Sequence, residues 1–373
     1  MKVVLIGTAH PYRGGLAVFN ERLIRQFQNE GNEAEIMTFT LQYPSLLFPG
    51  KTQYSTEPKP EDLKITRCVN SINPFNWIKV GRKLRKMRPD LVIIKFWLPF
   101  MAPCFGKIAR LARKNGHTKV VSVLDNVIPH EKRIGDRALV RYFVNSVDGF
   151  VAMSKSVEDD LGQFDTVKPR TLCPHPLFDS FGERISRDAA LDFLKIDKNT
   201  RYFLFFGLVR AYKGLDLLID AFADERLRKF QVKLLIAGEF YDDLKPYLEQ
   251  IDKLGLNDLV ILNNQFINDT DVKYYFNSAD MIVQPYKSAT QSGVTQIAYH
   301  FEKPMLVTNV GGLGEIIPNG KVGYVVEPNP AAIADALVDF CENERYDGFV
   351  EGVREEKKKY LWSNMTDAIK KVL

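Results

Sequence analysis

Small polar residues and glycine gather where a predicted strand, residues 280–284, turns into a predicted helix, residues 294–301. The residues at this junction are Gln291, Ser292, Gly293, Val294 and Thr295. Small residues at a helix start leave backbone N–H groups uncovered, and the helix dipole adds partial positive charge at the same point. The junction therefore predicts a site for a phosphate or diphosphate. An ordinary strand–loop–helix corner with a polar cap is the alternative.

Two cations follow another predicted strand, residues 202–207. Arg210 and Lys213 lie in the loop between this strand and an amphipathic helix at residues 215–222. Ligands of open parallel sheets bind at the carboxyl ends of the strands. Arg holds phosphate through two parallel hydrogen bonds, and Lys acts as a point charge. Solvated loop cations are the alternative, but two such corners in one half of the chain favour an anion site.

These segments resemble the donor half of the family 4 glycosyltransferases. The resemblance rests on Phe-Gly-Leu-Val-Arg-Ala-Tyr-Lys-Gly-Leu-Asp at residues 206–216, on Ser-Gly-Val at 292–294 and on Val-Gly-Gly-Leu-Gly-Glu at 310–315, and it extends over nearly the whole chain. Members are retaining enzymes that use sugar nucleotides. The resemblance implies the GT-B fold, an α/β architecture of two Rossmann-like doubly wound domains facing a central cleft. It also implies a nucleoside-diphosphate sugar as donor substrate and no cofactor or metal.

The donor half departs from the family pattern at two positions. Many members carry a pair of glutamates, and counting back from Pro304 places Ala289 and Ile297 there. Neither side chain can hydrogen-bond a ribose or a sugar, so we expect the junction residues to supply those hydrogen bonds. Glu239 is a further donor-binding candidate, because the loop after the strand at 232–237 lies along the nucleotide base in relatives. The departure leaves the donor's identity open.

The first half opens as strand, loop, helix and strand over residues 1–38, which predicts a doubly wound α/β domain. The loop contains Arg13, Gly14 and Gly15. The resemblance implies that the two glycines face the donor phosphates and the reacting sugar. A tight turn that needs a positive φ is the alternative for one of the glycines.

A second loop of the first half carries side chains suited to chemistry. Asp125, Asn126, His130 and Glu131 follow the strand predicted at 119–124. In the family that the chain resembles, the position of Asp125 is often a histidine that lies near the reacting sugar. His130-Glu131 is similar to a Pro-His-Glu loop of one branch of that family. A histidine can donate to a sugar hydroxyl or a phosphate. A hydrogen-bonded loop anchor is the alternative for His130.

We therefore name Arg210, Lys213, Asp125 and His130 as catalytic candidates and place four residues on the acceptor side: Arg13, Trp97, Asn126 and Glu131. Trp97 follows the buried strand that begins at residue 90. An aromatic ring at a strand end stacks on a sugar face or holds an acyl chain, and packing between the domains is the alternative.

The length of 373 residues, with 45% hydrophobic and 26% charged residues, suits a globular protein of two domains. We expect an acceptor-binding domain at 1–180, a nucleotide-sugar-binding domain at 181–345, and a tail at 346–373 that crosses back to the first. No apolar run has the length of a signal peptide or a membrane span, and the four cysteines lack disulfide or metal spacing. We therefore expect a cytoplasmic location.

Asp269-Thr-Asp271 has the form of a two-aspartate metal motif, but these acids open a predicted helix, where acids cap N–H groups.

Charge is uneven along the chain. Residues 1–180 contain 27 Lys and Arg against 17 Asp and Glu, a balance of +10, and the remainder has a balance of −5. The basic half, which includes a cationic helix at 77–87, favours an anionic partner such as a lipid-linked acceptor or the inner face of a membrane. A solvated basic face is the alternative. No nucleic-acid-binding motif is visible, so nucleic acid is not an expected partner.

The sequence thus predicts a metal-independent, retaining glycosyltransferase of hexosyltransferase type. It would move a sugar from a nucleoside-diphosphate sugar to a glycan or lipid-linked acceptor in cell-surface polysaccharide synthesis. Two rivals remain: a sugar-nucleotide epimerase on the same fold, and a non-catalytic nucleotide-sugar-binding scaffold subunit, which the absence of the two glutamates supports.

Overall fold

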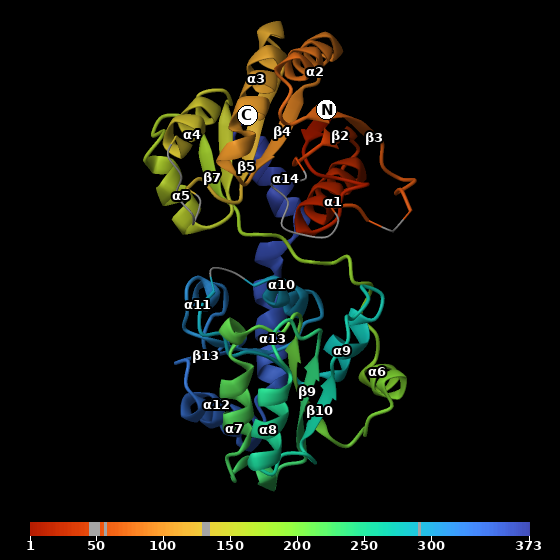
Figure 1. The fold of residues 1–373 in the computed structure, drawn as a ribbon, viewed down its shortest axis with the longest axis vertical. Coiled ribbons are helices and arrows are strands. Elements are labelled where there is room, and N and C mark those ends of the chain that lie inside the picture. The colour runs from red at the N-terminus through yellow and green to blue at the C-terminus, as the bar shows by residue number, and fades with distance from the viewer. Residues whose placement is uncertain (45–52, 56–57, 129–134, 290–291) are drawn as a thin grey trace. The chain divides into compact units, whose positions relative to one another are not determined.

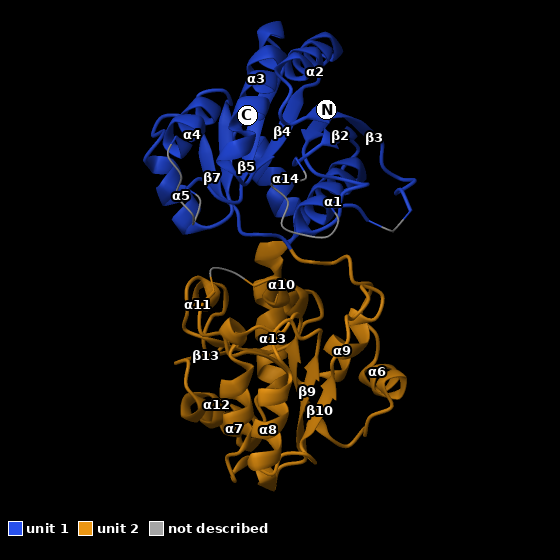
Figure 2. Cartoon of the chain, in the orientation of Figure 1, with its two compact units in different colours: residues 1–176, 361–373 blue, residues 177–360 orange. Residues whose placement is uncertain are grey.

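The computed structural model describes residues 1–44, 53–55, 58–128, 135–289 and 292–373. The chain forms two compact units (Figure 2). Unit 1 consists of residues 1–176 together with 361–373, and unit 2 consists of residues 177–360. The predicted tail at 346–373 is thus divided, since residues 346–360 belong to unit 2 and only 361–373 belong to unit 1.

Unit 1 is built on a parallel sheet in the order β3-β2-β1-β4-β5-β6-β7 (Figure 1). The strands are β1 (Lys2–Ile6), β2 (Glu33–Leu41), β3 (Ile65–Asn70), β4 (Leu91–Phe96), β5 (Lys119–Leu124), β6 (Gly149–Ala152) and β7 (Arg170–Leu172). The helices are α1 (Gly15–Asn29), α2 (Pro74–Met87), α3 (Ala102–Ala112), α4 (Asp136–Val144), α5 (Lys155–Gly162) and α14 (Trp362–Lys371). The strands run as near-continuous apolar segments because helices cover both faces of the sheet.

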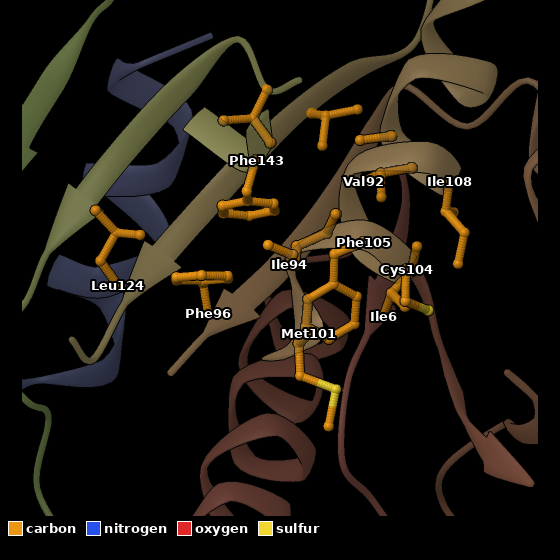
Figure 3. Packing of buried hydrophobic residues seen from close by; sticks show 14 of the residues in the cluster. Ile6, Val92, Ile94, Phe96, Met101, Cys104, Phe105, Ile108, Leu124 and Phe143 are labelled. Atoms are coloured by element: carbon orange, nitrogen blue, oxygen red, sulfur yellow. The ribbon is translucent and has the colours of Figure 1, made fainter. Parts of the chain in front are cut away.

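Alternating side chains of β4 divide the unit 1 core into two layers. Val92, Ile94 and Phe96 pack with α2, α3 and α4, and Phe96 stacks on Phe143 of α4 with ring centroids 4.2 Å apart (Figure 3). Leu91 and the other alternate residues face α1 and α14. Residues 361–373 therefore complete a layer of the unit 1 core that the first 176 residues leave uncovered.

Unit 2 has a parallel sheet in the order β10-β9-β8-β11-β12-β13. Its strands are β8 (Arg201–Phe206), β9 (Val232–Ala237), β10 (Val260–Asn263), β11 (Met281–Gln284), β12 (Met305–Thr308) and β13 (Gly323–Val326). Its helices are α6 (Arg187–Leu194), α7 (Leu215–Phe222), α8 (Lys245–Lys253), α9 (Val272–Ser278), α10 (Gly293–His300), α11 (Leu313–Ile316), α12 (Pro330–Glu342) and α13 (Tyr346–Glu356). Helices α7, α8 and α12 pack in one apolar cluster, and α9 and α10 pack in another. The two predicted anion corners, after β8 and before α10, both lie at carboxyl ends of neighbouring strands.

Candidate functional site

The basic loop after β8 and the start of α10 meet at Gly207. This glycine has φ +100°, and a Cβ placed on it would lie 3.2 Å from Lys213 Nζ and 4.0 Å from Val294 Cγ2. An L side chain rarely adopts this backbone conformation. Two segments separated by some eighty residues in the sequence therefore approach one point, and glycine leaves room there.

Lys213 ends a 3-10 turn, Ala211–Lys213, and is buried. Its Nζ lies 5.6 Å from the centroid of the Tyr286 ring, and the hydroxyl of Tyr286 is 3.3 Å from Ser292 Oγ. Burial, and secondarily the charge of Arg210, lowers the pKa of Lys213 to about 8. Within the described part of the chain, neither Lys213 nor Arg210 forms an ion pair with a carboxylate. The two cations thus form a like-charged pair without a carboxylate partner in the ranges that the structure describes.

Backbone contacts fix the loop that carries these cations. A Cβ on Gly214, which has φ +67°, would overlap the carbonyl oxygen of Pro285. The backbone N–H of Lys287 donates to the carbonyl oxygen of Tyr212 at 2.7 Å. Arg210 is exposed, with its guanidinium carbon 5.1 Å from the centroid of the Tyr241 ring. The loop is therefore tied to the segment after β11, while its arginine faces solvent.

One backbone N–H at the start of α10 is already hydrogen-bonded by the helix cap. Ser292 is the N-cap residue, and its Oγ accepts a hydrogen bond from the backbone N–H of Val294 at 3.3 Å. Thr295 is fully buried, and its Oγ1 lies 3.2 Å from the side-chain amide of Gln284, so the hydroxyl faces the core. Gly293 lies against Phe178. Gln291 lies outside the described residues.

The positions that carry glutamate in many relatives belong to the packed interior here. Ile297 is buried and Ala289 packs against the same apolar cluster. Glu239 is exposed beside the cationic loop, and its carbonyl oxygen accepts a hydrogen bond from Val209 N–H at 2.8 Å. A Cβ on the preceding Gly238 would overlap the carbonyl oxygen of Gly207. The loop after β9 thus joins the same corner of unit 2.

The glycine loop of unit 1 leaves open space at the head of α1. Gly14 is the N-cap residue with φ +101°, which identifies it as the glycine that the turn requires, and among the described residues a Cβ on Gly14 or Gly15 would meet no atom within 4 Å. Arg13 is exposed, and its backbone N–H donates to the carbonyl oxygen of Gln53 at 3.0 Å. The open space permits close approach of a ligand to this backbone.

The other candidates of unit 1 have varied surroundings. Asp125 follows β5 and forms an ion pair with the buried Lys95, which lay inside a predicted apolar strand and was not among the sequence candidates. Asn126 is half-buried. The ring nitrogen of Trp97 donates to Tyr43 Oη at 2.7 Å, so its polar edge is occupied within unit 1. His130 and Glu131 lie outside the described residues.

No group of three or more His, Cys, Asp or Glu side chains suited to a metal ion occurs among the described residues. Asp271 does occupy the N-cap position of α9, but its side chain forms no capping hydrogen bond there. Of the helices in the described ranges, none combines the length and the apolar character that crossing a membrane requires.

Two family models match nearly consecutive parts of the chain. The model described as Glycosyltransferase Family 4 matches residues 13–174, and the model described as Glycosyl transferases group 1 matches residues 186–359. The chain belongs to the family 4 glycosyltransferases. The predicted family and the GT-B fold class, with two parallel-sheet α/β domains, are confirmed.

Individual proteins also match over most of the chain. An uncharacterized glycosyltransferase of Methanocaldococcus jannaschii is 22% identical over 100% of this chain and 97% of its own length. The O-antigen chain mannosyltransferase C of Escherichia coli is 26% identical over 73% of this chain and 71% of its own. The crystal structure of Anabaena HepE in complex with UDP and glucose superposes with a TM-score of 0.69 at 14% identity, covering 99% of this chain and 98% of HepE.

Proposed function

We propose that this glycosyltransferase moves a hexosyl group from a nucleoside-diphosphate sugar to a hydroxyl of a glycan or lipid-linked acceptor, with retention at the anomeric carbon. The meeting of Lys213, Gly207 and the head of α10 carries the proposal, because it joins a helix N-terminus to a cation that has no ion-pair partner among the described residues. HepE, which shares the fold, was crystallised with UDP and glucose. The likeness to an O-antigen chain mannosyltransferase supports a role in cell-surface polysaccharide synthesis.

In the proposed reaction, the bond between the anomeric carbon and the leaving phosphate oxygen breaks, and a bond from that carbon to the acceptor oxygen forms. The acceptor's proton passes to the leaving phosphate oxygen, so nucleoside diphosphate and glycosylated acceptor are the products. Negative charge grows on the diphosphate as it departs. Arg210 and Lys213 stabilise that charge from fixed positions, which is the work that a metal ion performs in other transferases.

The buried position of Lys213 strengthens its effect on a bound diphosphate. An ion pair in a partly desolvated site is worth more than the same pair in water. With a pKa of about 8, Lys213 is mainly cationic at neutral pH before the donor arrives. The donor's negative charge then compensates both cations at once, which favours binding and makes no demand for a metal.

We propose that the acceptor is reached at the inner face of a membrane, through the exposed side of α2. Phe75 is 85% exposed, and Lys79, Arg82, Lys83 and Lys86 follow it at helical spacing on the same face. In the described ranges, none of these four cations has an ion-pair partner. Juxtamembrane Lys and Arg contribute about 1 kcal/mol each on an anionic surface.

Vesicle sedimentation tests this membrane contact. The intact protein should sediment with phosphatidylglycerol-containing vesicles at low salt and remain in solution with phosphatidylcholine alone. Lys79→Glu with Lys83→Glu should abolish the difference, whereas the control Lys229→Glu with Lys233→Glu, on unit 2, should retain it. Equal sedimentation of both double variants would contradict a role for α2.

Product analysis tests the transfer reaction itself. Uridine, guanosine and adenosine diphosphates are first titrated to find the nucleoside, and matching sugar nucleotides are then offered with glycan and lipid-linked acceptors. We expect nucleoside diphosphate to be released only when an acceptor is present, and the product's anomeric configuration, read by NMR, to equal the donor's.

The same experiment separates the rivals. Conversion of the sugar nucleotide without any acceptor would identify an epimerase. Tight binding without turnover over the full acceptor panel would identify a scaffold subunit, for which Ala289 and the buried Ile297 are the observations in favour. Absence of binding to every nucleoside diphosphate would refute the proposed site.

A further inference from the structure

One charged side chain lies inside the core of unit 1. Lys95 is the fifth residue of β4, and its side chain is 3% exposed. By strand alternation it shares with Leu91 and Ile93 the face that α1 and α14 cover. Burying an ammonium group costs several kcal/mol unless partners compensate it, and well-packed apolar residues often serve stability as well as a buried ion pair. Packing alone therefore gives no reason for a lysine at this position.

A carboxylate and an aromatic ring contact the ammonium group. Lys95 Nζ lies 3.2 Å from Asp125 Oδ1 and 3.1 Å from the centroid of the Phe19 ring of α1. The Phe19 ring in turn contacts His175 and Trp362, each with its ring centroid 5.1 Å away. Asp125 and Phe19 thus contact the buried cation directly, and side chains from α14 and the segment after β7 pack on Phe19.

Asp125 connects this buried charge to the surface. It lies at the carboxyl end of the sheet, where its backbone N–H donates to the carbonyl oxygen of Phe96 at 2.9 Å. Its side chain is 18% exposed, against 3% for Lys95. A ligand at this edge of the sheet can therefore touch Asp125 but is shielded from Lys95.

We propose that Lys95 is a positioning residue for sugar transfer: its ammonium group fixes one oxygen of Asp125, and the other oxygen accepts a hydrogen bond from a hydroxyl of the sugar substrate. This inference rests on the proposed function and extends it to a residue that touches no substrate. The hydroxyl belongs to the donor sugar or to the acceptor, and the KM of each substrate distinguishes the two.

The charges around the pair determine the protonation state of Asp125. Burial raises the pKa of the Asp125 carboxyl, and the Lys95 ammonium opposes that rise, so removing Lys95 raises the pKa further. Burial, with the charge of Lys95 second, lowers the pKa of His175 to about 3, which keeps this ring neutral at neutral pH. From α1, the guanidinium carbon of Arg22 lies 5.2 Å from the centroid of the Trp362 ring. Because the His175 ring stays neutral and the Arg22 guanidinium stays protonated at these pH values, the fall of activity at acid pH should report on protonation of Asp125.

Three variants of the intact chain test the inference: Lys95→Met, Asp125→Asn and the two combined. Asp125→Asn should lower kcat/KM by about tenfold to a hundredfold, as expected for the loss of a hydrogen bond to a charged group. Lys95→Met should lower it by a smaller factor and move the acid limb of the pH profile to higher pH. Asp125→Asn should lack that limb.

The double variant decides whether Lys95 acts through Asp125. We expect it to match Asp125→Asn, because the coupling leaves Lys95 no separate contribution. A further tenfold loss would overturn the inference. Each single variant leaves one charge of the pair buried without its partner, Asp125 in Lys95→Met and Lys95 in Asp125→Asn, whereas the double variant buries no unpaired charge. If a single variant fails to fold, the double variant is compared with the wild type and should show the loss of about tenfold to a hundredfold expected for Asp125→Asn.

Lys303→Met is the matched control, because Lys303 is also a buried lysine, with Nζ donating to the carbonyl oxygen of Asn277 at 3.2 Å in unit 2. Its acid limb should coincide with that of the wild type. Infrared difference spectra between wild type and Asp125→Asn then follow the protonated carboxyl band of Asp125 without any turnover. That band should appear at higher pH in Lys95→Met than in wild type, and coincident titrations would refute the role of Lys95. Absence of transfer by the wild type would refute the proposed function alone.

Discussion

Replacing Lys213 by methionine should make the protein more stable and its donor site weaker. Methionine has nearly the length of lysine but carries no charge, so it fills the same space beside Tyr286. The pKa of Lys213 falls from 10.5 to about 8 in the folded protein. Since each pKa unit corresponds to 1.36 kcal/mol, holding the charged form in this site costs up to about 3 kcal/mol at neutral pH.

The pH dependence gives the sign of this effect. Between pH 8 and 10.5 the unfolded chain binds more protons at Lys213 than the folded chain does, so the wild type gains stability as the pH rises through that window. Lys213→Met should therefore show its full advantage below pH 8 and lose it toward pH 10.5. Thermal unfolding of the intact chain at pH 7 should move upward by several degrees.

Donor binding should change in the opposite direction. With a pKa of about 8, Lys213 is about nine-tenths protonated at pH 7 and about one-tenth at pH 9, so the wild type should lose about tenfold in affinity for a nucleoside diphosphate over this interval. Lys213→Met should bind more weakly at pH 7 and show only the dependence that the ligand's own phosphates impose. Calorimetric titration at both pH values measures this. A variant that binds as tightly as wild type, or that is less stable, would refute the reasoning.

Three further substitutions test the surrounding structure. Gly207→Ala should weaken nucleoside-diphosphate binding in titration, because its Cβ would lie 3.2 Å from Lys213 Nζ at φ +100°; unchanged affinity would mean that this glycine is not needed for access. Ser292→Ala should cost about 1 kcal/mol of stability through loss of the α10 cap and should also weaken donor binding, whereas Ser186→Ala, which removes the equivalent cap of α6, should cost stability alone. Trp362→Ala should destabilise unit 1 by about 3–5 kcal/mol in chemical denaturation, since this buried ring anchors α14, and a loss under 1 kcal/mol would contradict that anchoring.

Much of the architecture follows from local sequence patterns. The alternation of apolar segments with amphipathic ones predicts parallel strands covered by helices, and the structure has that arrangement in both units. The places of the two segments proposed to bind phosphate were predictable for the same reason, because the strand ends before Arg210 and before Ser292 can be read from hydrophobic runs. Their approach at Gly207 depends on β8 and β11 being neighbours in the sheet, which no local pattern specifies.

The contacts that individual side chains make were less predictable from the sequence. Thr295 was expected to serve a ligand, yet its hydroxyl faces Gln284 in the interior. Lys95 went unnoticed because a single cation in an apolar strand resembles an edge position, and only the fold shows that β4 lies between β1 and β5. The signal that was available is the charge itself, since a lysine within an otherwise apolar run needs a partner.

Burial of a lysine does not by itself identify a ligand site. Burial lowers the pKa of both Lys213 and Lys303 to about 8. Lys303 donates to the backbone carbonyl oxygen of Asn277, and the charges around it are of both signs: Asp280 and Glu302 raise its pKa, whereas Arg184 and Arg187 lower it. Lys213 has Arg210 as its charged neighbour, and the charge of Arg210 lowers the pKa of Lys213 further. Under the proposed function, a pair of cations held together in this way stores unfavourable energy that binding of a diphosphate would release, and this release would favour the charged leaving group over a neutral ligand of the same size.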